Sequence, residues 1–91
     1  MQVRWTRPAA QDLQHIAQRI RQDNPAAALR VAKTLYDGCM ALETFPNRGR
    51  VGRITGTREL VFAPLPYIVV YRVKEEVVEI LRIYHSGQNW P

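Results

Sequence analysis

Several side chains of this sequence could together cleave RNA. Cleavage through the 2′-hydroxyl needs a base to take its proton, cations to stabilise charge on the phosphoryl oxygens, and an acid for the leaving oxygen. Glu59 or His85 could be the base, and His85 or Tyr84 could be the acid. The available cations are Arg50, Arg53 and Arg58. For a nuclease, we expect Arg58, His85 and Arg50 to be the catalytic residues.

Arg58 and Glu59 belong to a stretch of alternating polarity, which is typical of a strand. Neighbouring side chains of a strand point to opposite faces, so these two cannot meet at one phosphate unless a bulge intervenes. We therefore expect Arg58 to lie on the functional surface and Glu59 to pair with a neighbouring cation.

Positive charge is concentrated in one segment. The net charge is +5, and eleven of the thirteen Lys and Arg residues are Arg, which favours bidentate contacts to carboxylate or phosphate. Residues 47–56 show no clear period and indicate a loop, which holds Arg48, Arg50 and Arg53 but no acid. Its glycines permit close approach of the backbone to a ligand. We expect an acidic partner, either nucleic acid, an acidic protein segment or both in competition, unless the charge serves solubility alone.

His85 and Trp90 each have a plainer interpretation beside the functional one. In an alternating strand, His85 falls on the same face as Leu81 and Ile83, so it could be a half-buried histidine hydrogen-bonded to backbone. Trp90 could stack on a base or enter a protein pocket, or it could fold back over the sheet edge. Two His and one Cys give no metal-ligand spacing, and no glycine motif for a nucleotide is present. We expect neither a metal nor a cofactor.

The spacing of apolar residues predicts the elements that position these groups. Val3 and Trp5 alternate with polar residues, as in a short strand. Helical spacing predicts one helix over 8–22 and a second that begins at Pro25 and ends at Phe45 and Pro46. Because the link between them is very short, the two helices should form a hairpin. Cys39 should be buried in the second helix.

The second half of the chain indicates strands. Period-two patterns predict strands over 57–63, 67–73 and 77–85, with a turn at 74–76. The whole chain, 1–91, is expected to be a single α+β domain. In it, an N-terminal strand and a helical hairpin precede a three-stranded antiparallel meander, and the helices pack on one face of the sheet.

The second predicted helix carries more apolar residues than one buried face requires. Leu29, Tyr36 and Met40 form a second apolar line beside its core stripe. This line could dock a partner, or the helix could simply be central and contact both the sheet and the first helix.

A series of short motifs follows a fixed order along nearly the whole chain. They are Trp5 with Ala9, Asp12, Leu13 and Ile16; Asn24, Pro25 and Ala28; Leu42, Phe45, Pro46 and Gly49; Gly56, Thr57, Arg58, Glu59 and Leu60; Pro66, Tyr67, Val70, Tyr71 and Arg72; and His85, Trp90 and Pro91. In this order and spacing they resemble the ParE/RelE toxin superfamily. The resemblance implies an intracellular toxin encoded beside an antitoxin that wraps it.

The resemblance offers two targets. RelE-like members cut messenger RNA on the ribosome, and ParE-like members poison DNA gyrase. The Arg58, Glu59, Leu60 segment and the ending in His, Trp and Pro are closer to the ParE-like branch. RelE-like nucleases generally use lysines and a terminal Tyr, whereas this chain has two lysines and ends in Trp90, which cannot transfer a proton.

We therefore expect a cytoplasmic toxin that poisons gyrase and is neutralised by an acidic, partly disordered antitoxin. No apolar run approaches the ~20 residues that span a bilayer, and no signal peptide is apparent. The alternatives are a ribosome-dependent endoribonuclease and a non-toxic basic RNA-binding module. The expected antitoxin-binding residues are Leu29, Tyr36 and Met40, and the expected target-binding residues are Arg48, Arg50, Arg53, Arg58, His85 and Trp90.

Overall fold

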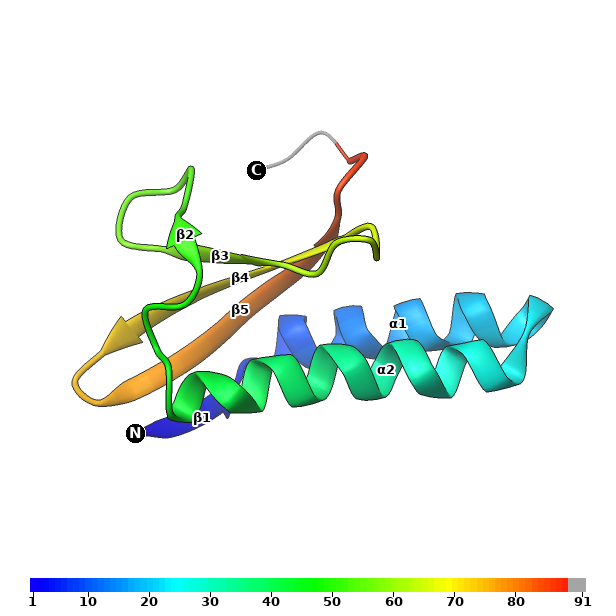
Figure 1. The fold of residues 1–91 in the computed structure, drawn as a ribbon, viewed down its shortest axis with the longest axis horizontal. Helices are drawn as coiled ribbons and strands as arrows, with labels where there is room; N and C mark the ends of the chain where they lie inside the picture. Colours follow the sequence, from blue (N-terminus) through cyan, green and yellow to red (C-terminus); the bar gives the residue numbers. More distant parts are fainter. Residues whose placement is uncertain (89–91) are drawn as a thin grey trace.

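The computed structural model describes residues 1–88, which form a helical hairpin on one face of a five-stranded sheet (Figure 1). This confirms the α+β class. The tip of the hairpin projects beyond the sheet (Figure 1). The elements are β1 (Gln2–Trp5), α1 (Arg7–Asp23), α2 (Pro25–Met40), a 3₁₀ turn (Ala41–Glu43), β2 (Arg50–Val51), β3 (Arg58–Val61), β4 (Tyr67–Lys74) and β5 (Val77–His85).

The sheet has the order β1-β5-β4-β3-β2. The predicted meander is present, because β3, β4 and β5 pair antiparallel in sequence order. The N-terminal strand β1 joins the same sheet and runs parallel to β5 at one edge. Among the described residues, neither helix is long and apolar enough to cross a membrane.

Both helices begin at residues whose side chains cap them. Thr6 accepts a hydrogen bond from the Ala9 N–H at 3.3 Å and begins α1. Asn24, at the tip of the hairpin, caps both helices. Its N–H donates to the Ile20 carbonyl at 2.8 Å, which ends α1, and its Oδ1 accepts from the Ala27 N–H at 3.0 Å, which begins α2. Asn24 alone therefore links the helices, which confirms the prediction of a very short link.

Two predicted boundaries were wrong. The second helix does not reach Phe45, because it ends at Met40 and tightens into the 3₁₀ turn, where the Thr44 N–H donates to the Ala41 carbonyl. Residues 47–56 are not entirely a loop, since Arg50–Val51 forms the edge strand β2. Arg50 lies opposite Glu59 and Val51 lies opposite Arg58, so pairing with β3 creates this strand.

The main core lies between the helices and the sheet. Its fully buried members include Leu35 and Cys39 of α2, Tyr71 of β4, and Ile80 of β5. Cys39 is buried, as predicted, and its burial raises the pKa of the thiol to about 12. A smaller cluster of Ile68 and Val70 packs on the opposite face. Strand β4 is thus covered on both sides, as expected of a central strand.

Candidate functional site

Buried Glu59 organises one end of the sheet, which we call the loop end and define by Arg50, Arg53, Arg58, Glu59 and Tyr71. Glu59 is 2% exposed. Its Oε1 accepts from Arg50 Nη2 at 2.9 Å and Nε at 3.1 Å, and its Oε2 accepts from the Arg53 N–H at 2.8 Å. Burial alone would raise the pKa of this carboxyl, but the hydrogen bonds from Arg53 and Arg50 outweigh it and lower that pKa below its usual value. The predicted pairing of Glu59 with a neighbouring cation is confirmed.

Arg58 lies on the other face of β3, which is the face toward the helices. Its Nη1 donates to the Gly49 carbonyl at 2.7 Å and to the Asn47 carbonyl at 3.3 Å. The Tyr71 hydroxyl beside it donates to the Pro46 carbonyl at 2.7 Å and accepts from the Gly49 N–H at 2.9 Å. The Arg58 guanidinium therefore holds the loop to the sheet, a structural role that the sequence did not predict.

Gly49 shows what the loop glycines do. A Cβ at this position would lie 2.8 Å from the Tyr71 ring and 2.9 Å from the Glu59 carbonyl oxygen. The close approach that glycine permits is therefore to the chain itself, whereas the sequence suggested a ligand.

The three loop arginines and Arg58 of β3 lie at the same end of the sheet but do not form one cationic surface. Arg50 and Glu59 are paired on the face away from the helices, whereas Arg58 is on the helix face. Arg48 and Arg53 have exposed side chains. The predicted target-binding surface is therefore divided between two faces.

His85 lies at the opposite end of the sheet. It pairs with Tyr67 across β4 and β5, and the two rings meet edge to face with centroids 5.7 Å apart. Its Nδ1 accepts from the Gly87 N–H at 3.1 Å, and its own N–H donates to Gln88 Oε1 at 2.6 Å. The histidine is half-buried and bonded to backbone, in agreement with its plainer interpretation.

The expected catalytic residues are not brought together. Arg58 pairs with Tyr71 and His85 pairs with Tyr67, four residues away along β4. At the rise of a strand, this separation is roughly 13 Å. Arg50 is engaged by Glu59 on the other face.

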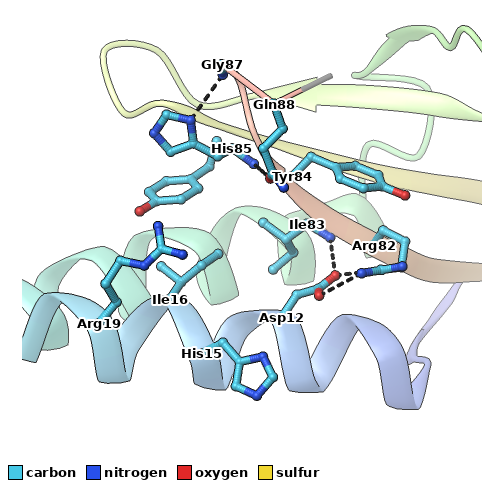
Figure 2. A pocket seen from close by; sticks show the side chains of 11 residues that line it. Asp12, His15, Ile16, Arg19, Arg82, Ile83, Tyr84, His85, Gly87 and Gln88 are labelled. Carbon is cyan, nitrogen blue, oxygen red and sulfur yellow. Dashed lines mark hydrogen bonds and ion pairs between the residues drawn. The ribbon is translucent and has the colours of Figure 1, made fainter. Parts of the chain in front are cut away.

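A cleft of about 470 Å³ opens between α1 and the end of β5 (Figure 2). We call this region the cleft end and define it by Asp12, Arg19, Tyr67, Arg82 and His85. The carboxylate of Asp12 ties α1 to β5, because it accepts from Arg82 Nε at 2.8 Å, Arg82 Nη2 at 3.0 Å and the Ile83 N–H at 2.9 Å. The hydrogen bond to Asp12 raises the pKa of Arg82 above its usual value.

The sequence did not predict Arg19 or Tyr67 as site residues. A signal was present for Arg19, since Asp12, Ile16 and Arg19 share one helix face at helical spacing. His15 is exposed and is one of the residues that line the cleft (Figure 2). Within residues 1–88, no group of three or more His, Cys, Asp or Glu could hold a metal ion.

The second apolar line of α2 is partly covered. Leu29 is 75% exposed and Tyr36 is 47% exposed. The ring of Tyr36 stacks on Trp5 of β1 at 5.9 Å with an interplanar angle of 11°. Met40 is half-buried.

Trp90, which the sequence predicts as a target-binding residue, lies outside the described residues.

Comparisons with known proteins agree on one family. The family model described as "ParE toxin of type II toxin-antitoxin system, parDE" matches residues 3–90. The chain is 45% identical to Y4kP of Sinorhizobium fredii over 98% of its own length and 92% of that protein. It is 41% identical to the Caulobacter vibrioides protein named Toxin RelE2, over 96% of this chain and 97% of that protein.

Two solved structures share the fold. One belongs to a chromosomal ParDE toxin–antitoxin system from P. aeruginosa, with a TM-score of 0.86, 31% identity, and coverage of 93% of this chain and 95% of that chain. The other belongs to the toxin–antitoxin complex RelBE2 from Mycobacterium tuberculosis, with a TM-score of 0.58, 30% identity, and coverage of 92% and 95%. The chain is therefore a member of the ParE toxin family of type II toxin–antitoxin systems.

Proposed function

We propose that this toxin arrests bacterial growth in the cytoplasm by binding and poisoning DNA gyrase. The observation that carries the proposal is the separation of the groups that RNA cleavage would need. His85 lies at the cleft end, whereas Arg58 and Arg50 lie at the loop end on opposite faces of the sheet. A protein that acts by binding does not need these groups at one phosphate.

The loop-end contacts weaken the nuclease alternative further. Glu59 is a poor general base, because it is buried and its two oxygens already accept hydrogen bonds from Arg50 and Arg53. Arg58 is likewise bound to two loop carbonyls. RNA cleavage at this end would require these bonds to break first.

The proposed gyrase contacts are the end of β5, the tail that follows it, and the exposed part of the arginine loop. Arg48, Arg50 and Arg53 all have exposed side chains, although Arg50 is paired with Glu59, and His85 is the last residue of β5. Because these groups are cationic or polar, they suit an acidic surface of the target.

We further propose that an acidic cognate antitoxin neutralises the toxin. The solved relatives are described as toxin–antitoxin systems. Leu29 and Tyr36 present exposed apolar surface on α2 that suits a helix or an extended segment of such a partner. The net charge of +5 favours an acidic sequence for it.

A second candidate function is ribosome-dependent RNA cleavage. One observation favours it: the Gly87 N–H binds Nδ1 of His85, which leaves Nε2 as the ring nitrogen that could exchange a proton with a substrate in the cleft. The relative named Toxin RelE2 is consistent with this branch.

Induced expression of the chain with two readouts decides between the candidates. We expect growth arrest together with DNA breaks covalently linked to gyrase, and no new 5′ ends in translated messages. Message cuts that disappear in the His85→Ala variant would defeat the gyrase proposal. Normal growth with confirmed intact protein would defeat both candidates and favour a non-toxic RNA-binding role.

A further inference from the structure

The ring of Tyr67 belongs to the core, but its hydroxyl lies at the cleft end. Tyr67 is 8% exposed and lines the cleft between α1 and β5. Its hydroxyl has no hydrogen-bond partner among residues 1–88. The hydroxyl oxygen is not fully buried, so it reaches the cleft and can donate a hydrogen bond to a ligand there.

Two more donors reach the same cleft from other elements. Arg19 extends from α1 toward the side where His85 lies (Figure 2). Arg19 has no ion pair or hydrogen bond within the described part of the chain. His85 accepts from the Gly87 N–H at Nδ1, so the neutral ring carries its proton on Nε2, which can donate. Three unused donors from α1, β4 and β5 therefore line one cleft.

The charges of the cleft select the ligand. Arg82 is already compensated by the bidentate Asp12 carboxylate, which leaves Arg19 as the cation without a counter-ion among the described lining residues. One uncompensated positive charge suits a monoanion. A phosphate dianion would carry a second negative charge, which the nearby Asp12 carboxylate would repel. Ile16 and Ile83 add apolar lining that suits the methylene groups of an acidic side chain.

We propose that this cleft binds a single carboxylate of an acidic polypeptide, to which Arg19, Tyr67 and His85 donate hydrogen bonds. The identification of that polypeptide as the antitoxin rests on the proposed function. The cleft lies along α1, so this contact adds to the exposed apolar line of α2 and fixes the partner at a second point.

Nuclear magnetic resonance of the isotope-labelled chain tests the site without the partner. The probe is N-acetyl-L-glutamate α-amide, which carries one side-chain carboxylate. We expect saturable shifts of the Arg19 Nε–H and His85 ring signals. Arg19→Gln should weaken the apparent affinity about tenfold, because it removes the charge-assisted bonds. Arg21→Gln is the matched control on the same helix, since Arg21 does not line the cleft, and it should bind like the wild type.

Other outcomes would overturn the inference. Equal binding by the Arg19→Gln and wild-type chains would exclude this cleft as the carboxylate site. Larger shifts of the same signals with inorganic phosphate or with a 5′-phosphorylated dinucleotide would replace the carboxylate by a phosphate ligand. The Tyr67→Phe variant gives an independent check, because it should fold normally yet bind the probe several-fold more weakly.

The site and the proposed function can fail separately. If the chain arrests growth and poisons gyrase but the probe does not bind, the carboxylate site is wrong and the function stands. If the probe binds as expected but gyrase is unaffected, the site stands and the gyrase proposal fails.

Discussion

The loop end and the cleft end of the sheet use similar residue types in opposite ways. At the loop end, the polar atoms form hydrogen bonds within the chain, as those of Glu59, Arg58 and Tyr71 do. At the cleft end, the Tyr67 hydroxyl and the Arg19 guanidinium have no such partners within residues 1–88. A basic stretch of sequence is therefore not by itself a binding surface, since its charges can stabilise the fold.

The largest expected effect concerns Glu59. Glu59→Ala would leave the Arg53 N–H without its acceptor and Arg50 without its counter-ion, so we expect a loss of about 2–4 kcal/mol in the free energy of unfolding. Glu79→Ala is the matched control, because Glu79 pairs with Arg72 at 2.6 Å with a more exposed side chain. It should cost less than about 1 kcal/mol. Similar losses in chemical denaturation would remove the distinction between a structural and a surface ion pair.

The same carboxylate should make stability depend on pH. Its folded-state pKa lies below the unfolded value, so its contribution is complete above the unfolded pKa and is lost as the pH falls through the folded pKa. The advantage of the wild type over Glu59→Gln in unfolding free energy should therefore shrink as the pH falls from about 6 to about 3. An advantage that stays constant over this range would show that ionisation of Glu59 does not stabilise the fold.

Regular elements with strong periods could be predicted from the sequence. The caps Thr6 and Asn24 and the β-branched run of β4 specify their elements locally, so the helical hairpin and the meander were predicted. Strand β2 could not be predicted, because two residues carry no period and the strand exists only through its pairing with β3. The 3₁₀ ending of α2 was also missed. The turn contains Leu42, which is fully buried, and this tertiary packing is not visible in the local sequence.

The candidate site was predicted only in part. Alternation along β3 correctly placed Arg58 and Glu59 on opposite faces, which led to the pairing of Glu59. The cleft was missed because Arg19 and Tyr67 are distant in the sequence and meet only through the packing of α1 against the sheet. The loop arginines did not form the predicted surface, because no local pattern reveals that buried Glu59 accepts hydrogen bonds from the Arg50 guanidinium and the Arg53 N–H.

The two tyrosines of β4 test the contrast between the ends most directly. Both lie on the helix face and both are buried, yet within residues 1–88 only the Tyr71 hydroxyl is hydrogen-bonded, to Pro46 and Gly49. Thermal or denaturant unfolding should show a loss of about 1–2 kcal/mol for Tyr71→Phe and a change within about 0.5 kcal/mol for Tyr67→Phe. Equal losses for the two variants, or a larger loss for Tyr67→Phe, would contradict the account.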